Sequence, residues 1–190
     1  MKNLPLRTLN SIDTLAWPNN TGCVTHKTPA LSILTDFTQH FPLVVTGDVK
    51  AIELEKMMKQ SHVKMKLVVD DHNKFIGLVT LFDVNEENIL KKVDKNMPRN
   101  ELTVRDFMHT RESLKCFDFH DLANATVGDV LATQRENHLQ HCLVIDSTEN
   151  TIRGVISARD IARLLSPNVS AERHFSFEDL FNEITPRMAS

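Results

Sequence analysis

The sequence has few of the features that mark a membrane or secreted protein. No stretch of its 190 residues approaches the roughly 20 apolar residues that a membrane-spanning helix needs. Polar residues and Pro interrupt residues 1–20 before a signal-like core develops. Only Cys23, Cys116 and Cys142 occur, an odd number at wide spacing that forms no disulfide framework and indicates a reducing compartment. We therefore expect a cytoplasmic protein that does not engage a membrane.

An excess of positive charge is also missing. The 22 Lys and Arg residues stand against 25 Asp and Glu residues, the net charge is −3, and no segment is a basic run. We therefore expect no nucleic-acid partner. The apolar fraction of 41% and the charged fraction of 25% are those of an ordinary globular domain, so the chain should fold.

Catalytic and metal-binding motifs are absent as well. The sequence has no Gly-x-Ser-x-Gly elbow, no Walker loop, no His-Glu-x-x-His and no Cys-x-x-Cys pair. Cys116 with His120 lacks a third group that could orient a nucleophile. His141 and Cys142 are neighbours on an expected strand and should face opposite sides, which argues against a metal site with His138. We expect no enzyme activity, no metal and no required cofactor.

The chain does contain an internal repeat. Residues 77–84 align with residues 154–161 at a spacing of 77, with the leading Gly and the Asp identical. Residues 61–70 align with residues 137–146 at a spacing of 76, so the second copy has one extra residue in the intervening turn. A turn is where an insertion is tolerated best.

Each copy is predicted to fold as helix, strand, turn, strand and helix. Asp48 is the expected N-cap of the first helix, which runs to about Gln60, and Thr126 with Asp129 forms a capping-box pattern before the second. His62 and His138, at the ends of these helices, are interpreted as structural. The remaining elements are expected as strands at 66–69, 75–80, 142–145 and 152–157 and closing helices at 81–93 and 158–165.

These elements predict an α/β (α+β) fold of two halves that pack together. A hairpin with two helices leaves an apolar face and a sheet edge exposed, so neither half is stable alone. We expect residues 29–45 to supply the leading strand of the first copy and residues 102–108 to open the second. The expected organisation is an N-terminal extension (1–40), a first repeat (41–95), a linker with the second repeat (96–168) and a C-terminal amphipathic helix (169–190).

The repeated pattern Gly-apolar-apolar-Thr/Ser-x-x-Asp-apolar, after a strand ending in Val-Val-Asp or Val-Ile-Asp, resembles the cystathionine-beta-synthase (CBS) domain family. The resemblance covers about residues 41–165, and residues 106–108 are similar to the Asp-Val-Met stretch ahead of many CBS repeats. It implies tandem repeats packed about a pseudo-two-fold axis and modules that pair into homodimers. It also implies adenosine-containing ligands, such as AMP, ADP, ATP or S-adenosylmethionine, in clefts between the repeats.

The candidate binding residues lie where the second strand of each copy runs into its closing helix. Thr80 and Ser157 stand at the expected helix N-termini, where a hydroxyl and unpaired backbone N–H groups favour an anion. Asp83 and Asp160 follow three residues later, and the resemblance assigns the matching Asp to the ribose hydroxyls. Arg159 adds a forked cation to the second site. Phe82 holds the equivalent place in the first, so we rank the second site higher.

Two interpretations of these residues remain open. Ser/Thr-x-x-Asp at a helix start is also a variant capping box, in which hydroxyl and carboxylate make only local bonds. The leading hypothesis is a regulatory module that senses an adenosyl ligand. The alternative is a non-enzymatic dimerisation or interaction module with degenerate nucleotide pockets, which acts on an unknown effector protein.

Overall fold

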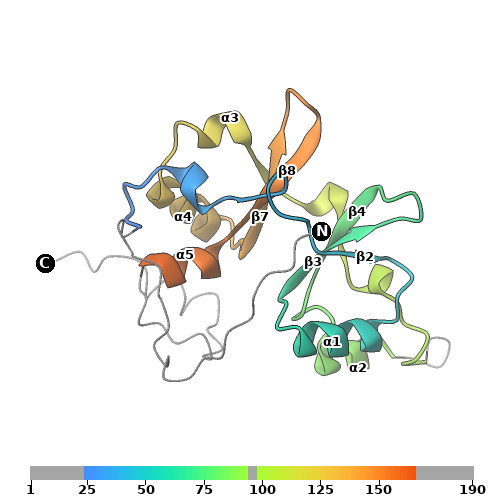
Figure 1. Cartoon of the computed structure of the whole chain (residues 1–190). Helices are drawn as coiled ribbons and strands as arrows, with labels where there is room; N and C mark the ends of the chain where they lie inside the picture. Colours follow the sequence, from blue (N-terminus) through green and yellow to red (C-terminus); the bar gives the residue numbers. More distant parts are fainter. Residues whose placement is uncertain (1–23, 94–97, 166–190) are drawn as a thin grey trace, which may run out of the picture.

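The computed structural model describes residues 24–93 and 98–165. These residues form two halves side by side, each a four-stranded sheet with helices packed on it (Figure 1). The α+β fold and the pairing of two equivalent halves, both predicted from the sequence, are confirmed. None of the described helices is long and apolar enough to cross a membrane.

The first half contains most of the chain up to Thr110. Its elements are β2 (Val44–Thr46), α1 (Ala51–Gln60), β3 (Met65–Val69), β4 (Phe75–Thr80), α2 (Glu86–Lys92), the 3-10 turn η2 (Val104–Asp106) and β5 (His109–Thr110). The second half contains η1 (Ala30–Ile33), β1 (Thr35–Asp36), η3 (Arg111–Ser113), β6 (Cys116–Asp118), α3 (Phe119–Leu122), α4 (Val127–Glu136), β7 (His141–Asp146), β8 (Thr151–Ser157) and α5 (Ala158–Leu165).

In each sheet, one outer strand comes from the segment that precedes the other repeat in the sequence. The strand orders are β2-β3-β4-β5 and β1-β8-β7-β6. β5 precedes the second repeat but pairs with β4, and β1 precedes the first repeat but pairs with β8. In Figure 1 the blue start of the described chain accordingly lies with α4, α5 and β8. Two expectations are corrected: of the segment 29–45 only Val44 and Val45 join the first sheet, as part of β2, and residues 102–108 pack in the first half.

The two repeated glycines explain this exchange of outer strands. A Cβ on Gly77 would lie 2.4 Å from the carbonyl oxygen of His109, and a Cβ on Gly154 would lie 2.4 Å from that of Thr35. Both distances are far inside van der Waals contact. Only a residue without a side chain lets the exchanged strand approach each β-hairpin so closely.

Backbone irregularities repeat at the same positions in the two halves. Both hairpins have a register shift, at Val68/Val69 and at Val144/Ile145. The left-handed conformation recurs in the hairpin turns and directly after helices α1 and α4, at Asn73, Asn150, His62 and His138, with φ between 52° and 58°. The two histidines therefore serve as left-handed residues that end helices, a place usually given to Gly or Asn.

The helix faces and one of the two predicted caps agree with the structure. Ala51, Leu54 and Met58 of α1 are fully buried, and the capping box of Thr126 and Asp129 at α4 is present. Asp48, however, does not cap α1. The helix starts after Lys50, and Asp48 instead accepts a hydrogen bond from Arg105 Nε at 2.9 Å.

The closing helices differ between the halves. In the second half, α5 has the predicted bounds within the described residues. In the first half, residues 81–84 form turns and α2 begins only at Glu86, because the Asn85 side chain accepts the backbone N–H of Asn88 and caps the helix there. The predicted end of α5 at residues 166–167 and the tail helix lie outside the described residues.

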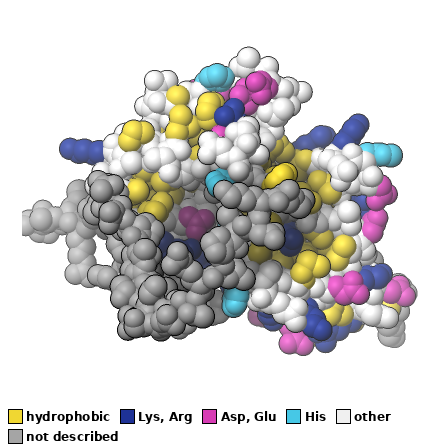
Figure 2. All heavy atoms as spheres, viewed as in Figure 1, with side chains coloured by type: hydrophobic (Ala, Val, Ile, Leu, Met, Phe, Trp, Pro, Cys, Tyr) yellow, Lys and Arg dark blue, Asp and Glu magenta, His cyan; other side chains and the backbone are white. Residues whose placement is uncertain are grey.

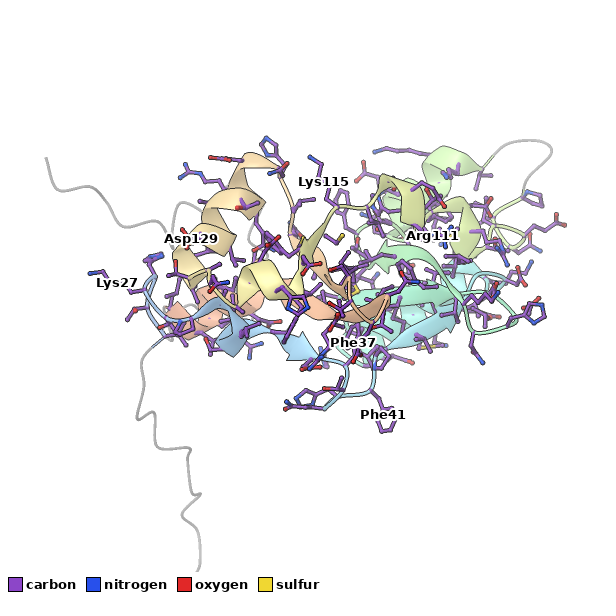
Figure 3. The ribbon with its side chains drawn as sticks, turned by 90° about the horizontal axis from the view of Figure 1, so that it is seen from above. Lys27, Phe37, Phe41, Arg111, Lys115 and Asp129 are labelled. Atoms are coloured by element: carbon purple, nitrogen blue, oxygen red, sulfur yellow. The ribbon has the colours of Figure 1, made fainter. Side chains whose placement is uncertain are left out.

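A separate apolar cluster joins the two halves. One core lies in each half, and a third cluster contains Leu67 and Leu78 of the first sheet with Leu143 and Val155 of the second. Phe37 packs against this third cluster and lies where the halves meet in Figure 3, whereas Phe41 points away from the body. The halves bury the sheet faces that neither could cover alone.

An ion pair fastens β1 to the second sheet. The Arg153 guanidinium donates from Nε to Asp36 Oδ1 at 3.0 Å and from a terminal nitrogen to Oδ2 at 3.1 Å. These bonds hold the pKa of Asp36 well below its usual range, at about 2. Arg153 also stacks on the Phe119 ring, 4.5 Å from its centroid. Figure 2 shows a group of Lys, Arg, Asp and Glu side chains along the lower edge, over α1 and α2, and further charged side chains over the second half.

Candidate functional site

The first repeated motif forms a closed local cap. Oδ2 of Asp83 accepts the backbone N–H of Thr80 at 2.7 Å and the Thr80 hydroxyl at 2.6 Å. In return, the Asp83 N–H donates to the Thr80 hydroxyl oxygen at 3.3 Å. The Asp83 side chain is only 15% exposed. The capping interpretation of Ser/Thr-x-x-Asp therefore describes the first copy.

The second oxygen of Asp83 is also engaged, by a residue that the sequence did not single out. His109 Nε2 lies 3.1 Å from Asp83 Oδ1. His109 belongs to β5, where it pairs with Leu78 of β4, and this exchanged strand brings the imidazole to the carboxylate. No local pattern connects the two residues, which are 26 positions apart.

The second motif is more open. Ser157 Oγ accepts the Asp160 N–H at 3.3 Å, and α5 begins directly after Ser157. The Asp160 carboxylate is 60% exposed, and its ion-pair partner is Arg163, one turn further along the same helix at 3.6 Å. Surface pairs of this kind are weak. The second copy thus presents an accessible carboxylate where the first has a closed cap.

His141 stands between the two motifs. It pairs with Ser157 across β7 and β8, while Met65 holds the equivalent place opposite Thr80. Burial lowers the pKa of His141, and the carboxylates of Asp160 and Asp83 partly offset that effect while Arg159 adds to it. His141 is therefore within electrostatic reach of both carboxylates.

Arg159 and Phe82 keep the contrast expected from the sequence. Arg159, the second residue of α5, is partly buried, whereas Phe82 at the corresponding position of the first copy is 74% exposed.

The metal and cysteine chemistry considered in the sequence has no site among the described residues. These residues hold no group of three His, Cys, Asp or Glu that could bind a metal. Cys142 is buried, which raises the pKa of its thiol to about 12 and makes it unreactive.

The second motif can therefore offer three kinds of group to one ligand. Ser157 supplies a hydroxyl, the start of α5 supplies the positive end of the helix dipole, and Asp160 supplies accessible acceptor oxygens, while the N–H groups of Ala158 and Asp160 already donate to Gln140 and Ser157. A ligand that combines an anionic group with neighbouring hydroxyls matches this set. Nothing in the arrangement requires a covalent step.

Comparisons with known proteins identify the fold. The CBS domain model matches residues 34–88 and 122–167, together more than half of the chain. A comparison with curated proteins gives no match. Among solved structures, an uncharacterized conserved protein from Pyrococcus horikoshii has 19% identity and a TM-score of 0.54, covering 80% of this chain and 98% of its own.

Two further solved structures contain ligands. The CBS domain pair of protein MJ0100, in complex with 5′-methylthioadenosine and S-adenosyl-L-methionine, has 18% identity and a TM-score of 0.53, over 74% of this chain and 98% of its own. The CBS domain of a bacterial CNNM/CorC family Mg²⁺ transporter, in complex with ATP, has 13% identity and a TM-score of 0.52, over 73% and 87%. Each family-model match contains the β-hairpin of one half and the helix that precedes it, and the chain belongs to the CBS domain family as a tandem pair.

Proposed function

We propose that this chain is a regulatory module that binds an adenosyl ligand, AMP, ADP, ATP or S-adenosylmethionine, between its repeats at Ser157, Arg159 and Asp160. The observation that carries the proposal is the accessible Asp160 carboxylate at the start of α5, three residues after a hydroxyl. The adenosyl ligands bound by the CBS domain pair of protein MJ0100, and the ATP bound by the transporter domain, support this ligand class.

Each residue has a distinct role in this proposal. The Asp160 carboxylate accepts hydrogen bonds from the ribose hydroxyls, and the Ser157 hydroxyl, at the positive end of the α5 dipole, donates to the anionic part of the ligand. Arg159 adds a forked cation for the same group. Thr80 and Asp83 form the corresponding set in the first copy.

The proposal also covers how the module acts. It works without catalysis, as a homodimer in the cytoplasm, and transmits ligand binding to an effector protein through a change in the arrangement of its repeats. Such control requires that the ligand prefers one arrangement over the other. The division into residues 1–40, 41–95, 96–168 and 169–190 belongs to the same proposal.

Isothermal titration with AMP, ADP, ATP and S-adenosylmethionine tests the proposed function. A hydrogen bond to a charged group is worth about 1.5–3 kcal/mol, so Asp160→Asn should weaken binding roughly 10- to 100-fold. Asp129→Asn is the matched control, because it neutralises another capping carboxylate of the same half, on α4, and should leave affinity unchanged. Absence of heat with all four ligands would favour an interaction module with degenerate pockets.

A further inference from the structure

The geometry points to closure of the first half-site, formed by Thr80 and Asp83, by the His109 side chain. The imidazole contacts the Asp83 carboxylate. Each chain therefore binds one adenosyl ligand, at Asp160, rather than two. This inference rests on the proposed function, and it specifies which half-site is used. A duplicated module would otherwise be expected to bind one ligand per copy.

The donors around Asp83 compete with a ribose for both carboxylate oxygens. Oδ2 receives two hydrogen bonds from Thr80, and Oδ1 receives the His109 imidazole at 3.1 Å. A ribose diol needs these same oxygens as acceptors. It would have to displace a charge-assisted hydrogen bond on a carboxylate that is only 15% exposed.

His109 is held in place by its backbone. Its strand pairs with β4, and its carbonyl oxygen lies against Gly77, in the space that any Cβ there would fill. The imidazole therefore does not depend on a flexible loop to reach Asp83. Moving it away requires a change of rotamer that breaks the bond to the carboxylate.

The second half lacks this closing residue. The register of β1 on β8 pairs Thr35 with Val155, as β5 on β4 pairs His109 with Leu78, and the Thr35 carbonyl lies against Gly154 in the same way. Thr35 is thus the structural counterpart of His109, and its side chain is exposed. Threonine is too short to reach across to the next motif, and Asp160 remains accessible. His109 therefore adds to the asymmetry that already follows from the two hydrogen bonds of Thr80 to Asp83 Oδ2.

This equivalence supplies the test, which uses the full chain and titration calorimetry with ATP and with S-adenosylmethionine. The wild type should bind one equivalent, lost in Asp160→Asn. His109→Thr makes the first half resemble the second, and the number of ligands bound per chain should rise from one to two. Adding Asp83→Asn to His109→Thr should return it to one. His109→Ala provides a second route to the open site if the threonine variant folds poorly by circular dichroism.

The outcomes separate this inference from the proposed function. Two equivalents bound by the wild type, or one equivalent bound by both His109 variants, would overturn the closure while leaving the proposed function intact. A wild type that binds neither these two ligands nor AMP or ADP would refute the proposed function alone. In that case one equivalent gained by His109→Thr would still support the closure, and none gained would overturn it too.

Discussion

Replacing Gly77 by alanine should loosen the outer strand of the first sheet. The new Cβ would start 2.4 Å from the His109 carbonyl oxygen, so β5 must retreat by roughly 1 Å to reach ordinary contact. Overpacking of this kind costs about 1–3 kcal/mol, and weakening the two-residue pairing with β4 adds about 1–2 kcal/mol. Alanine recovers about 0.5–1 kcal/mol of backbone entropy, which leaves a net loss of about 1–4.5 kcal/mol. Gly154→Ala should behave alike, against Thr35.

Urea unfolding followed by far-UV circular dichroism measures this loss as a lower midpoint at an unchanged slope. Gly47→Ala is the matched control, because the three atoms nearest to its Cβ belong to the Arg105 side chain and not to the backbone of a neighbouring strand. Arg105 must shift and give up its exposed ion pair with Asp48, so the control should lower stability by no more than about 1 kcal/mol. If Gly77→Ala and Gly154→Ala were as stable as Gly47→Ala, the close approach of the outer strands would not be the reason that glycine is needed at these two positions.

Two further predictions concern stability. Gln134 is fully buried, and its Oε1 has no hydrogen-bond partner among the described residues. Met58 holds the equivalent place in the first half. Gln134→Met should therefore raise the free energy of unfolding by about 1–2 kcal/mol in urea titrations. A lower stability would mean that the amide is paired in solution. Asp36→Asn should lower it by about 2 kcal/mol at pH 7. Because the pKa of Asp36 is lowered to about 2, its contribution to the free energy of unfolding is present above about pH 4 and is lost as the pH falls toward 2. The wild type should lose this part of its stability on acidification, and the variant should not. Parallel pH profiles of stability for the two proteins would refute the role of the Arg153 pair.

Local patterns in the sequence were enough for the hairpins. Phe75–Thr80 has the predicted bounds, β3 and β8 begin one residue earlier than predicted, and β7 is one residue longer at each end, because runs of β-branched residues between polar turns define these strands. The start of α2 could not be predicted. Asp83 and Asn85 are both good caps, and only the structure shows that the helix follows the second.

Contacts between the two halves could not be predicted from the sequence. β1 and β5 have two residues each, too few for a period-2 pattern, and their places are set by contacts with the other hairpin. For the same reason His109 was not singled out, although Asp83 was. The signal that could have found these strands is the glycine that recurs at 77 and 154, which marks a close backbone approach.

The exchange of outer strands means that the two repeats are not separable building blocks. A fragment ending at residue 93 would keep the β1 strand that the second sheet needs and would lack β5, while a fragment starting at residue 98 would have the opposite deficit. Each piece would carry the edge that completes its counterpart. The evolutionary unit of this chain is one repeat, but the unit of folding is the interleaved pair.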